Sequence, residues 1–271
     1  MIRTVLITGA ANGIGKATAA LAETKGFKVI RADLSEGDVA ADLSTPEGRE
    51  ELISSVRALC PNGLDAVITC AGLLVSSTTS ASLNYFGSVD VLEGLQPLLL
   101  KSPAPRVVLV SSRMAYANAA DSALVEFYLA GNENAARDRA QDLVARVEAQ
   151  TESRLVNQRT PVGIYASSKV AIARWTRRAA VSPRWGGSGI IVNAVAPGFI
   201  ETEAGLALRD HPVRSQVVRD MHPQALGRYG RPEEVAELML WLASPANSLM
   251  IGQLLCIDGG TEVLERGDSH W

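Results

Sequence analysis

The chain has 271 residues, of which 47% are hydrophobic and 20% are charged, and its net charge at pH 7 is −3. This balance argues against intrinsic disorder and predicts a globule with a substantial core. The 26 Lys and Arg residues are interspersed with 29 Asp and Glu residues, so we expect no binding to nucleic acid or to an anionic membrane.

Strand-like runs alternate with helical patterns along the chain, which is typical of a parallel sheet covered by helices on both faces. The first run, Thr4 to Thr8, is apolar or β-branched throughout, as expected for a strand buried on both sides. A glycine-rich turn follows, and then a helix is expected over 14–25, before Gly26. The later expected strands are 28–32, 64–70, 106–110, 189–195 and 254–257, and the later expected helices are 47–59, 86–100, 165–181 and 232–243.

This alternation predicts an α/β fold with a single Rossmann-type, doubly wound parallel sheet and helices on both faces. Such folds often reach about 250 residues around one sheet, so we expect one dinucleotide-binding and catalytic domain over residues 1–271. No apolar stretch approaches the roughly 18 residues that span a bilayer. Met1 leads directly into a strand-like run without the pattern of a signal peptide, which favours a cytoplasmic protein.

Residues 113–164 interrupt the alternation with a long segment rich in Ala, Glu and Arg. Within this segment, residues 133–150 have a helix-forming composition. The apolar stripe of that helix would consist of Ala136, Leu143, Val144 and Val147. We predict a helical insertion, and two interpretations of it remain open: a solvated surface excursion, or an element that forms a subunit contact or covers a cleft.

The three cysteines are far apart and form neither a C-x-x-C motif nor a cluster with histidine. No metal-ligand spacing of His and carboxylate residues is present either, so we expect no metal site. We interpret Cys60, Cys70 and Cys256 as reduced packing residues, and the apolar runs around Cys70 and Cys256 favour burial of both thiols.

The segment 8–15, TGAANGIG, places three glycines between the first strand and the first helix. Glycine tolerates positive φ and lets a ligand approach the backbone, while a helix N-terminus offers unpaired N–H groups and a positive dipole. In this strand-turn-helix context, a pyrophosphate-binding loop is favoured over a merely structural turn. The expected contact residues are Gly9, Asn12, Gly13, Ile14 and Gly15.

Asp33 lies just past the second expected strand. A carboxylate there can accept hydrogen bonds from the adenosine ribose hydroxyls and repels a 2′-phosphate, which favours NAD over NADP. Two alternatives stay open, because Asp33 could cap a turn and Arg31 could hold a phosphate. Asp42 and Leu43 could approach the adenine, although Asp42 could equally cap a turn or a helix.

Tyr165 and Lys169 are four residues apart in a helix expected to open near residue 165, so both side chains project from one face. By itself this spacing is equally typical of an amphipathic helix with a surface lysine. A phenol near pKa 10 is a poor base at neutral pH, and a neighbouring ammonium stabilises its anion. The pair is therefore a candidate acid/base device whose meaning depends on the rest of the chain.

Taken in order, several short motifs resemble the short-chain dehydrogenase/reductase family. They are TGAANGIG at 8–15, CAG at 70–72, NYFG at 84–87, VSS at 110–112, YASSK at 165–169, APG at 196–198 with Thr202, and IDGG at 257–260. Within the family, ADLSTPEGR at 41–49, CAGL at 70–73, NYFG and the long segment before Tyr165 resemble the bacterial 3α-hydroxysteroid dehydrogenase/carbonyl reductase group. The family usually has Asn where Cys70 stands, and a shorter gap between its serine and tyrosine.

The resemblance implies hydride transfer between a nicotinamide cofactor and a secondary alcohol or ketone. Tyr165 would be the acid/base, and Lys169 would stabilise its anion and hydrogen-bond the nicotinamide ribose. Ser112 would stabilise the substrate oxygen, with Ser111 as a close competitor for that role. Asn84 would support a proton relay through Lys169, or it could simply bend or cap its helix.

Further cofactor contacts follow from the same resemblance. They are Cys70, Ala71, Gly72, Pro197, Gly198 and Thr202, together with Tyr165 and Lys169. Thr202 would hold the nicotinamide carboxamide, whereas Pro197 and Gly198 could form only a turn.

Residues 201–230 are the expected substrate loop and lid, which we call the substrate segment. Its apolar side chains are Leu206, Leu208, Val213, Met221 and Leu226. They suit a hydrophobic ligand and could equally be helix-packing residues. The resemblance suggests a bulky cyclic alcohol or ketone, steroid- or terpenoid-like, and a homo-oligomer, either a dimer or a tetramer.

Two other functions remain as alternatives. A 3-oxoacyl-carrier reductase would usually prefer NADP and need a basic docking patch, so Asp33 and the net charge of −3 count against it. A catalytically silent dinucleotide-sensing protein would need the nucleotide site alone. Its weakness is that the chain retains the whole acid/base set, Asn84, Ser112, Tyr165 and Lys169.

Overall fold

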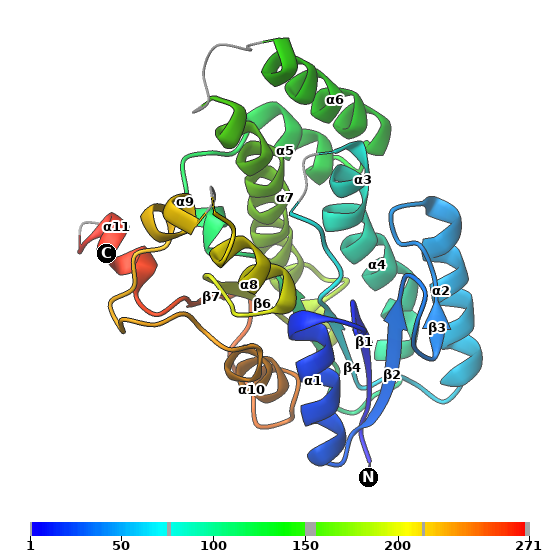
Figure 1. The fold of residues 1–271 in the computed structure, drawn as a ribbon. Coiled ribbons are helices and arrows are strands. Elements are labelled where there is room, and N and C mark those ends of the chain that lie inside the picture. The colour runs from blue at the N-terminus through cyan, green and yellow to red at the C-terminus, as the bar shows by residue number, and fades with distance from the viewer. Residues whose placement is uncertain (1, 75–76, 150–155, 213–214, 269–271) are drawn as a thin grey trace.

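The structure is a computed structural model that describes residues 2–74, 77–149, 156–212 and 215–268 (Figure 1). These residues form one sheet with the strand order β3-β2-β1-β4-β5-β6-β7, in which every neighbouring pair is parallel. The strands are β1 (Thr4–Thr8), β2 (Lys28–Asp33), β3 (Val39–Ala40), β4 (Ala66–Thr69), β5 (Arg106–Val110), β6 (Ile191–Pro197) and β7 (Leu254–Ile257). The predicted doubly wound parallel sheet is confirmed.

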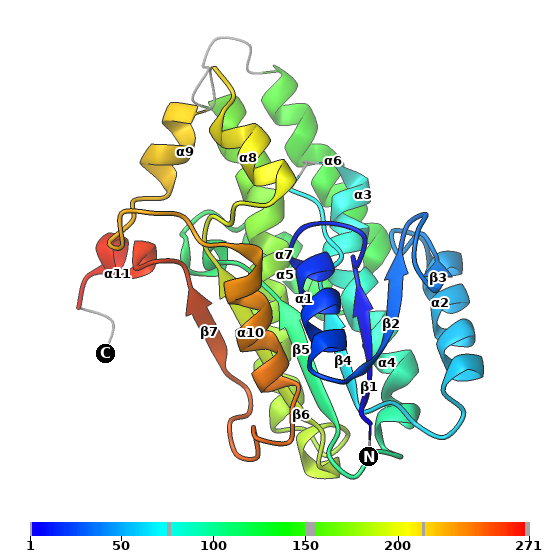
Figure 2. The same ribbon diagram turned by 60° about the horizontal axis from the view of Figure 1, so that its bottom comes forward.

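Helices cover both faces of the sheet (Figure 2). One face carries α1 (Gly13–Thr24) and α10 (Pro232–Leu242), and the other carries α2 (Pro46–Leu59), α4 (Gly87–Leu99) and α7 (Val156–Ala180). The side chains of β1 alternate between the two faces. Val5 and Ile7 belong to the apolar cluster on the side of α1 and α10, and Leu6 belongs to the cluster on the side of α2 and α4. This double burial explains why β1 has no polar face in the sequence.

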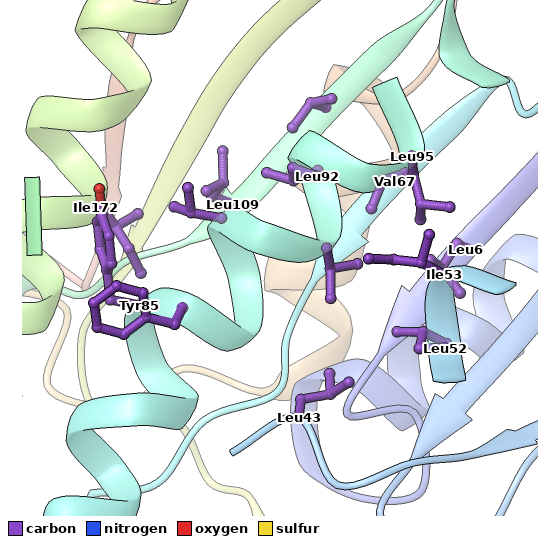
Figure 3. Packing of buried hydrophobic residues seen from close by; sticks show 14 of the residues in the cluster. Leu6, Leu43, Leu52, Ile53, Val67, Tyr85, Leu92, Leu95, Leu109 and Ile172 are labelled. Carbon is purple, nitrogen blue, oxygen red and sulfur yellow. The ribbon is translucent and has the colours of Figure 1, made fainter. Parts of the chain in front are cut away.

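The cluster that contains Leu6 is the larger of the two, and Figure 3 shows part of it. Leu52 from α2 and Leu92 and Leu95 from α4 are fully buried there together with strand residues such as Leu6 and Leu109. Each such side chain contributes about 1.5–3 kcal/mol through removal of apolar surface from water. The strands beneath the site are therefore held in place by closely packed apolar side chains.

The segment 113–164 contains the 3-10 helix Arg113–Tyr116, α5 (Ser122–Leu129), α6 (Glu133–Ala149) and the beginning of α7. Its first part belongs to the main core, because Tyr128 of α5 is fully buried with its ring centroid 5.1 Å from that of Tyr85. Ala136 of the expected stripe is buried on α6, while Leu143 and Val144 pack against the same cluster, and the Val147 side chain lies outside the described set. These contacts exclude a purely solvated excursion for α5 and the first half of α6.

Three sequence expectations need correction. Tyr165 does not open its helix, because α7 begins at Val156 and continues through it. The expected strand 189–195 starts later, since Gly189 has a φ of 83° and ends a short 3-10 helix. Cys256 is exposed rather than buried, because β7 is the edge strand of the sheet.

Several short elements were not expected from the sequence. They are β3, α3 (Thr78–Ala81), the π-helical turn Ser82–Phe86, α8 (Glu203–Arg209), α9 (Ser215–Met221) and α11 (Thr261–Arg266). Each of these elements has seven residues or fewer, a length over which hydrophobic periodicity carries little information. In Figure 2, α8 and α9 lie beyond the carboxyl ends of the central strands, above the sheet.

Candidate active site

The carboxyl ends of β1, β4, β5 and β6 lie side by side in the sheet. Thr8 pairs with Thr69, Thr69 with Leu109, and Val110 with Val195. Because all these strands are parallel, the loops that leave them converge along one edge, where ligands bind in open α/β sheets. These loops carry most of the residues that the sequence singled out.

The loop after β1 is shaped by close backbone packing. Gly9 has a φ of 66°, and a Cβ atom there would lie 2.7 Å from the backbone nitrogen of Ala71. A Cβ atom on Gly15 would lie 2.1 Å from the carbonyl oxygen of Gly9. No larger side chain fits at either position without moving backbone, so two of the expected glycines are required by the turn itself.

Helix α1 starts in this loop at Gly13, with Asn12 as its N-cap residue. The Asn12 side chain is exposed and makes no capping hydrogen bond, and the N–H groups of the first turn, including those of Ile14 and Gly15, have no partner within the helix. These groups form an open anion-binding end next to the sheet edge.

Thr202 faces the glycine loop from the other side. A Cβ atom on Gly13, whose φ is 52°, would lie 3.1 Å from the Thr202 methyl carbon. Thr202 also caps α8, since its hydroxyl accepts a hydrogen bond from the Gly205 N–H at 3.1 Å. The substrate segment therefore lies against the nucleotide loop at Thr202. The contact of Thr202 with a nicotinamide carboxamide stays a prediction.

Pro197 and Gly198 lead into Thr202 from the end of β6. Pro197 is the last residue of that strand and pairs with Ile257 of β7. The Gly198 N–H donates to the Ile257 carbonyl at 3.0 Å, and a Cβ atom on Gly198 would lie 2.5 Å from the Asp258 Cβ. Glycine is therefore needed for the close approach of two chain segments, whether or not these residues also touch a cofactor.

Asp33 holds the glycine loop in place. Its Oδ2 accepts a hydrogen bond from the Ala11 N–H at 2.9 Å, and its Oδ1 accepts from the Leu34 N–H at 2.8 Å. A carboxylate oxygen can accept more than one hydrogen bond, so a ribose contact remains compatible with this arrangement. Arg31, the alternative phosphate ligand, pairs with Glu23 at 2.7 Å instead.

Asp42 and Leu43 have structural roles in the chain. The Asp42 Oδ1 accepts from the N–H and the hydroxyl of Ser44, at 2.9 and 2.7 Å, which closes a tight turn before α2. The Leu43 side chain is buried in the larger core cluster. Their expected approach to adenine stays a prediction, and the turn-capping alternative for Asp42 is what the structure shows.

The chain leaving β4 is tied down by Asn84, which lies in the π-helical turn. Its Oδ1 accepts from the Leu73 N–H and its Nδ2 donates to the Leu73 carbonyl, both at 2.8 Å. A Cβ atom on Gly72 would lie 3.2 Å from the Asn84 Oδ1 and 3.8 Å from the Lys169 Nζ. Cys70 and Ala71 precede this point, and the Ala71 N–H donates to the buried Thr8 hydroxyl at 3.2 Å. Asn84 thus positions the 70–73 loop, while its proton-relay role stays a prediction.

The two serines after β5 have different partners. The Ser111 hydroxyl donates to the Lys169 backbone carbonyl at 2.9 Å and is buried beneath α7. The Ser112 hydroxyl accepts from the Met114 N–H at 3.2 Å and lies near enough to the Tyr165 phenol to oppose the rise that burial causes in its pKa. Ser112 is therefore the serine that meets the phenol, and Ser111 fixes the helix that carries it.

Lys169 lies one turn along α7 from Tyr165. Its ammonium nitrogen is 5.4 Å from the Tyr165 ring centroid and donates to the Val110 carbonyl at 2.9 Å. Burial lowers the pKa of Lys169 to about 8, so most molecules keep the ammonium at pH 7. Burial also raises the pKa of Tyr165, and the hydrogen bond from Ser112 opposes that rise.

Cys70 lies where the family usually has Asn. Burial raises the pKa of its thiol to about 12, against the opposing charge of Lys169. A Cβ atom on Gly15 would lie 3.2 Å from the Cys70 Cβ, so the side chain packs beneath the glycine loop. A neutral thiol here is a packing group, not a nucleophile.

The apolar side chains of the substrate segment are mostly half-buried. Leu206, Leu208 and Met221 are partly covered, whereas Leu226 is 68% exposed, and Val213 lies outside the described residues. The structure leaves both interpretations of these residues open, as ligand contacts or as helix packing.

One residue next to the site was not singled out from the sequence. Arg113 follows Ser112 directly and is only 4% exposed, with partners in the substrate segment and in α11. A charged residue immediately after an apolar strand is the signal that could have drawn attention to it.

The described residues show neither a metal-binding cluster nor a membrane-spanning helix. No group of three or more His, Cys, Asp or Glu side chains lies close enough together to hold a metal ion there. Within that same part of the chain, no helix combines the length and the apolar character needed to cross a membrane.

Two family models match the chain. The model described as short chain dehydrogenase matches residues 3–128, and the model described as Enoyl-(Acyl carrier protein) reductase matches residues 149–262. The chain is 32% identical over 268 residues to the 3-alpha-hydroxysteroid dehydrogenase/carbonyl reductase of Comamonas testosteroni, covering 97% of each protein. The chain therefore belongs to the short-chain dehydrogenase/reductase family.

Two other similar proteins are dehydrogenases of cyclic alcohols. The chain is 33% identical to the cis-4-hydroxycyclohexanecarboxylate dehydrogenase of Sinomonas cyclohexanicum, over 95% of this chain and 96% of that protein. The crystal structure of the 3-alpha-hydroxysteroid dehydrogenase from Pseudomonas sp. B-0831 complexed with NADH superimposes with a TM-score of 0.86 and 34% identity, covering 98% and 99% of the two chains. The protein is an oxidoreductase of this family that works with a nicotinamide dinucleotide and is similar to hydroxysteroid dehydrogenases and carbonyl reductases.

Proposed function

We propose that the protein is an NAD-dependent dehydrogenase and ketone reductase for a bulky cyclic secondary alcohol. The observation that carries the proposal is the geometry of α7 at the sheet edge that also holds the glycine loop: the buried Lys169 ammonium lies 5.4 Å from the Tyr165 ring centroid, and Ser112 is close enough to oppose the rise that burial causes in the pKa of the phenol. A sensor of nucleotides would need the glycine loop and would gain nothing from an aligned phenol, hydroxyl and ammonium. These three groups together favour catalysis.

The residues at this edge fit a nicotinamide dinucleotide. The close packing at Gly9 and Gly15 and the open first turn of α1 suit a pyrophosphate. The bound cofactor would supply the atom that accepts or donates the hydride. Lys169 would hold the nicotinamide ribose, and its ammonium favours the anionic form of Tyr165.

In the direction of alcohol oxidation, Tyr165 would take the hydroxyl proton while the carbinol hydrogen leaves as hydride. Ser112 would donate a hydrogen bond to the substrate oxygen and so stabilise the negative charge that develops there. In the reverse direction, Tyr165 would return the proton to the carbonyl oxygen. Asn84 would keep the 70–73 loop, and with it the space beside Lys169, in place.

The preference for NAD rests on Asp33. Its carboxylate lies at the end of β2 beside the glycine loop, where a 2′-phosphate would meet its negative charge. The variant Asp33→Asn keeps an oxygen that can accept from the Ala11 N–H but removes the charge. We expect kcat/KM with NADP to rise at least tenfold relative to that with NAD; an unchanged ratio would show that Asp33 does not select the cofactor.

The substrate class rests on the similar proteins and on the half-buried apolar side chains Leu206, Leu208 and Met221. The test is a spectrophotometric screen for NADH formation with cyclic secondary alcohols, from substituted cyclohexanols to hydroxysteroids, with linear 3-hydroxyacyl thioesters as the opposing class. Tyr165→Phe is assayed beside the wild type with NAD binding checked by titration. Wild-type turnover by that variant with NAD bound would refute the mechanism.

The runner-up is a 3-oxoacyl-carrier reductase. The model that matches residues 149–262 is described by a substrate on the same kind of acyl carrier, although its description gives a different reaction, enoyl reduction. A 3-oxoacyl-carrier reductase would be the better conclusion if the acyl thioesters were turned over more than tenfold faster than any cyclic alcohol. The net charge of −3 argues against a docking patch for an acidic carrier protein.

We also propose that the enzyme is a homo-oligomer, either a dimer or a tetramer. The family resemblance supports it, and exposed Leu264 on α11 and Trp241 on α10 would be covered in an assembly. Sedimentation equilibrium over a hundredfold range of concentration tests the assembly state directly, and a monomer throughout that range would end the proposal.

A further inference from the structure

Arg113 is a buried charge outside the acid/base set whose three nitrogen atoms all have partners. Its Nε donates to the His222 Nδ1 at 3.2 Å, its Nη1 donates to the Glu265 Oε2 at 2.7 Å, and its Nη2 donates to the Met221 carbonyl. The side chain is 4% exposed. A buried guanidinium is costly unless its donors are used, and here all three nitrogen atoms have acceptors.

The partners of Arg113 come from two distant parts of the chain. Met221 ends α9 and His222 follows it, inside the substrate segment, while Glu265 belongs to α11 near the C-terminus. Figure 1 shows α9 and α11 next to each other at one side of the sheet. Arg113 itself continues directly from Ser112, so one side chain links the serine-bearing turn to both elements.

Neighbouring contacts join the same two elements. The Thr261 hydroxyl donates to the Pro223 carbonyl at 2.7 Å, and the Gln224 side chain donates to the Thr261 hydroxyl at 2.8 Å. The Leu226 N–H donates to the Gly259 carbonyl at 3.2 Å. The end of the substrate segment is therefore bound along its length to the residues around α11, and Arg113 connects that unit to the site.

His222 takes part as a neutral side chain. Its Nδ1 can accept from Arg113 only without a proton, and burial together with the charge of Arg113 lowers the pKa of His222 to about 4. The ring also lies 5.3 Å from the ring of Phe199, which leads from β6 into the substrate segment. The contact of Arg113 is thus preserved through the neutral pH range.

Ser112 has an anchor that does not depend on the Arg113 side chain. Its hydroxyl accepts from the backbone N–H of Met114, and Ser111 beside it is fixed to the Lys169 carbonyl. Loss of the guanidinium would therefore release the end of the substrate segment and α11, as one unit, from the serine-bearing turn while leaving the acid/base groups in position. This separation predicts different effects on substrate affinity and on the chemical step.

We propose that Arg113 is a positioning residue that clamps the end of the substrate segment and α11 beside Ser112, and thereby sets the affinity for the alcohol or ketone. The inference rests on the proposed function. When the closed, binding-competent arrangement is populated only in part, the apparent dissociation constant rises in inverse proportion to that population. The contacts of Arg113 would keep nearly all molecules in the arrangement that binds substrate.

The test compares Arg113→Met, Glu265→Met and the double variant. We expect Arg113→Met to raise the KM for the alcohol about tenfold, to change kcat less than threefold, and to leave the Kd for NAD unchanged. Glu265→Met should raise KM less. If Glu265 acts through Arg113, the double variant will match Arg113→Met, because the two effects are not additive in a shared network.

The matched control is Arg174→Met. Arg174 on α7 pairs with Glu126 on α5 at 2.6 Å, close to the length of the Arg113–Glu265 pair, but at the protein surface. Its removal should leave KM and kcat at wild-type values. Glu265→Gln is the milder substitution if Arg113→Met folds poorly, and it should raise KM two- to threefold through loss of the ion pair.

Hydrogen exchange provides a readout that needs no substrate. In Arg113→Met, backbone amides of 215–222 and 261–266 should exchange at least tenfold faster, whereas those of β1 and β4 should be unchanged. Unchanged exchange in these two segments, or a fall in kcat with KM unaffected, would overturn the clamp. A wild-type enzyme that turns over no alcohol would refute the proposed function alone, because the exchange experiment still decides whether Arg113 holds the two segments.

Discussion

The nucleotide end and the substrate end of this site are held mainly by different kinds of interaction. The exceptions are the Asp33 side chain, which also supports the glycine loop, and the backbone hydrogen bond from Leu226 to Gly259 at the substrate end. The loop of Gly9 and Gly15 is fixed by backbone atoms that approach closer than any side chain allows, over a core that is fully buried. The end of the substrate segment is fixed by side-chain hydrogen bonds from Arg113 and Thr261. We therefore expect substitutions at Gly9 and Gly15 to disturb the backbone, whereas Arg113 and Thr261 lie outside the two apolar core clusters.

Because of this difference, we expect the two ends of the site to respond differently to substitution. Close backbone packing specifies one geometry, suited to a ligand that is the same for every substrate. Polar side-chain contacts between surface elements can be exchanged one at a time, each at a cost of about 0.5–3 kcal/mol. Substrate selection can therefore change while cofactor binding stays intact, and four substitutions or conditions test that separation.

The largest effect is expected for Lys169→Met, which lies between the two ends. Loss of the ammonium that favours the Tyr165 anion should reduce kcat/KM by about a thousandfold, or about 4 kcal/mol. The same substitution should stabilise the fold by about 1–3 kcal/mol at pH 7, because the pKa of Lys169 is lowered to about 8 and burial of its charge costs stability.

The sign of that stability effect can be checked through its pH dependence. Between pH 8 and pH 10.5 the Lys169 side chain binds more protons in the unfolded chain than in the folded one, so its contribution to the free energy of unfolding should rise with pH across this window. Urea unfolding at pH 7 and pH 10 measures it, and Lys169→Met should lack this component. A variant less stable than wild type at pH 7 would contradict the expected cost of the buried ammonium.

Gly15→Ala tests the nucleotide end. The added Cβ atom would lie 2.1 Å from the Gly9 carbonyl oxygen, so the loop must move. We expect the Kd for NAD to rise at least a hundredfold, about 2.7 kcal/mol, by calorimetric titration. Gly187→Ala is the control, since its Cβ would lie 3.3 Å from the nearest atom, the Ser182 carbonyl oxygen, and NAD binding should be unaffected. NAD affinity within threefold of wild type in Gly15→Ala would show that the loop is not rigid.

Acid pH tests the substrate end through His222. Its pKa is lowered to about 4 by burial and by Arg113, with Asp258 opposing, so the unfolded chain binds a proton first as pH falls below 6.5. The contribution of His222 to the free energy of unfolding is fully present above pH 6.5 and should fall by about 2 kcal/mol at pH 5. Urea unfolding of wild type and His222→Gln at pH 7 and pH 5 isolates this contribution. The same pH dependence in both proteins would remove His222 as its source.

The smallest effect is expected where the two ends meet, at Thr202. Thr202→Ala removes the hydroxyl that caps α8 and should cost about 1 kcal/mol of stability, with a modest rise in the KM for NAD. Thr202→Ser keeps the capping hydroxyl and removes the methyl group that faces Gly13. Thermal unfolding and steady-state kinetics of the pair separate the cap from the contact; equal stability of both variants would show that the cap contributes nothing.

The sequence predicted the sheet and the elements that surround the cofactor site because these depend on local patterns. A strand buried on both faces shows as an apolar run, and the turn after β1 needs glycine for reasons confined to a few residues. Short elements such as β3, α8 and α9 were missed, since their few residues carry no clear period. The start of α7 was placed too late for a related reason: the Tyr165–Lys169 pair marks a face of the helix, not its beginning.

By itself, the sequence determined the α/β class, the glycine loop and the shared face of Tyr165 and Lys169, because periodicity and backbone sterics act over short distances. Only the tertiary structure decided which of the two serines meets the phenol, since neighbouring residues at a strand end point in opposite directions. It also decided that Cys256 is exposed, through the place of β7 at the sheet edge. The partners of Arg113 are of the same kind, because residues so far apart in sequence meet only when the whole chain is folded.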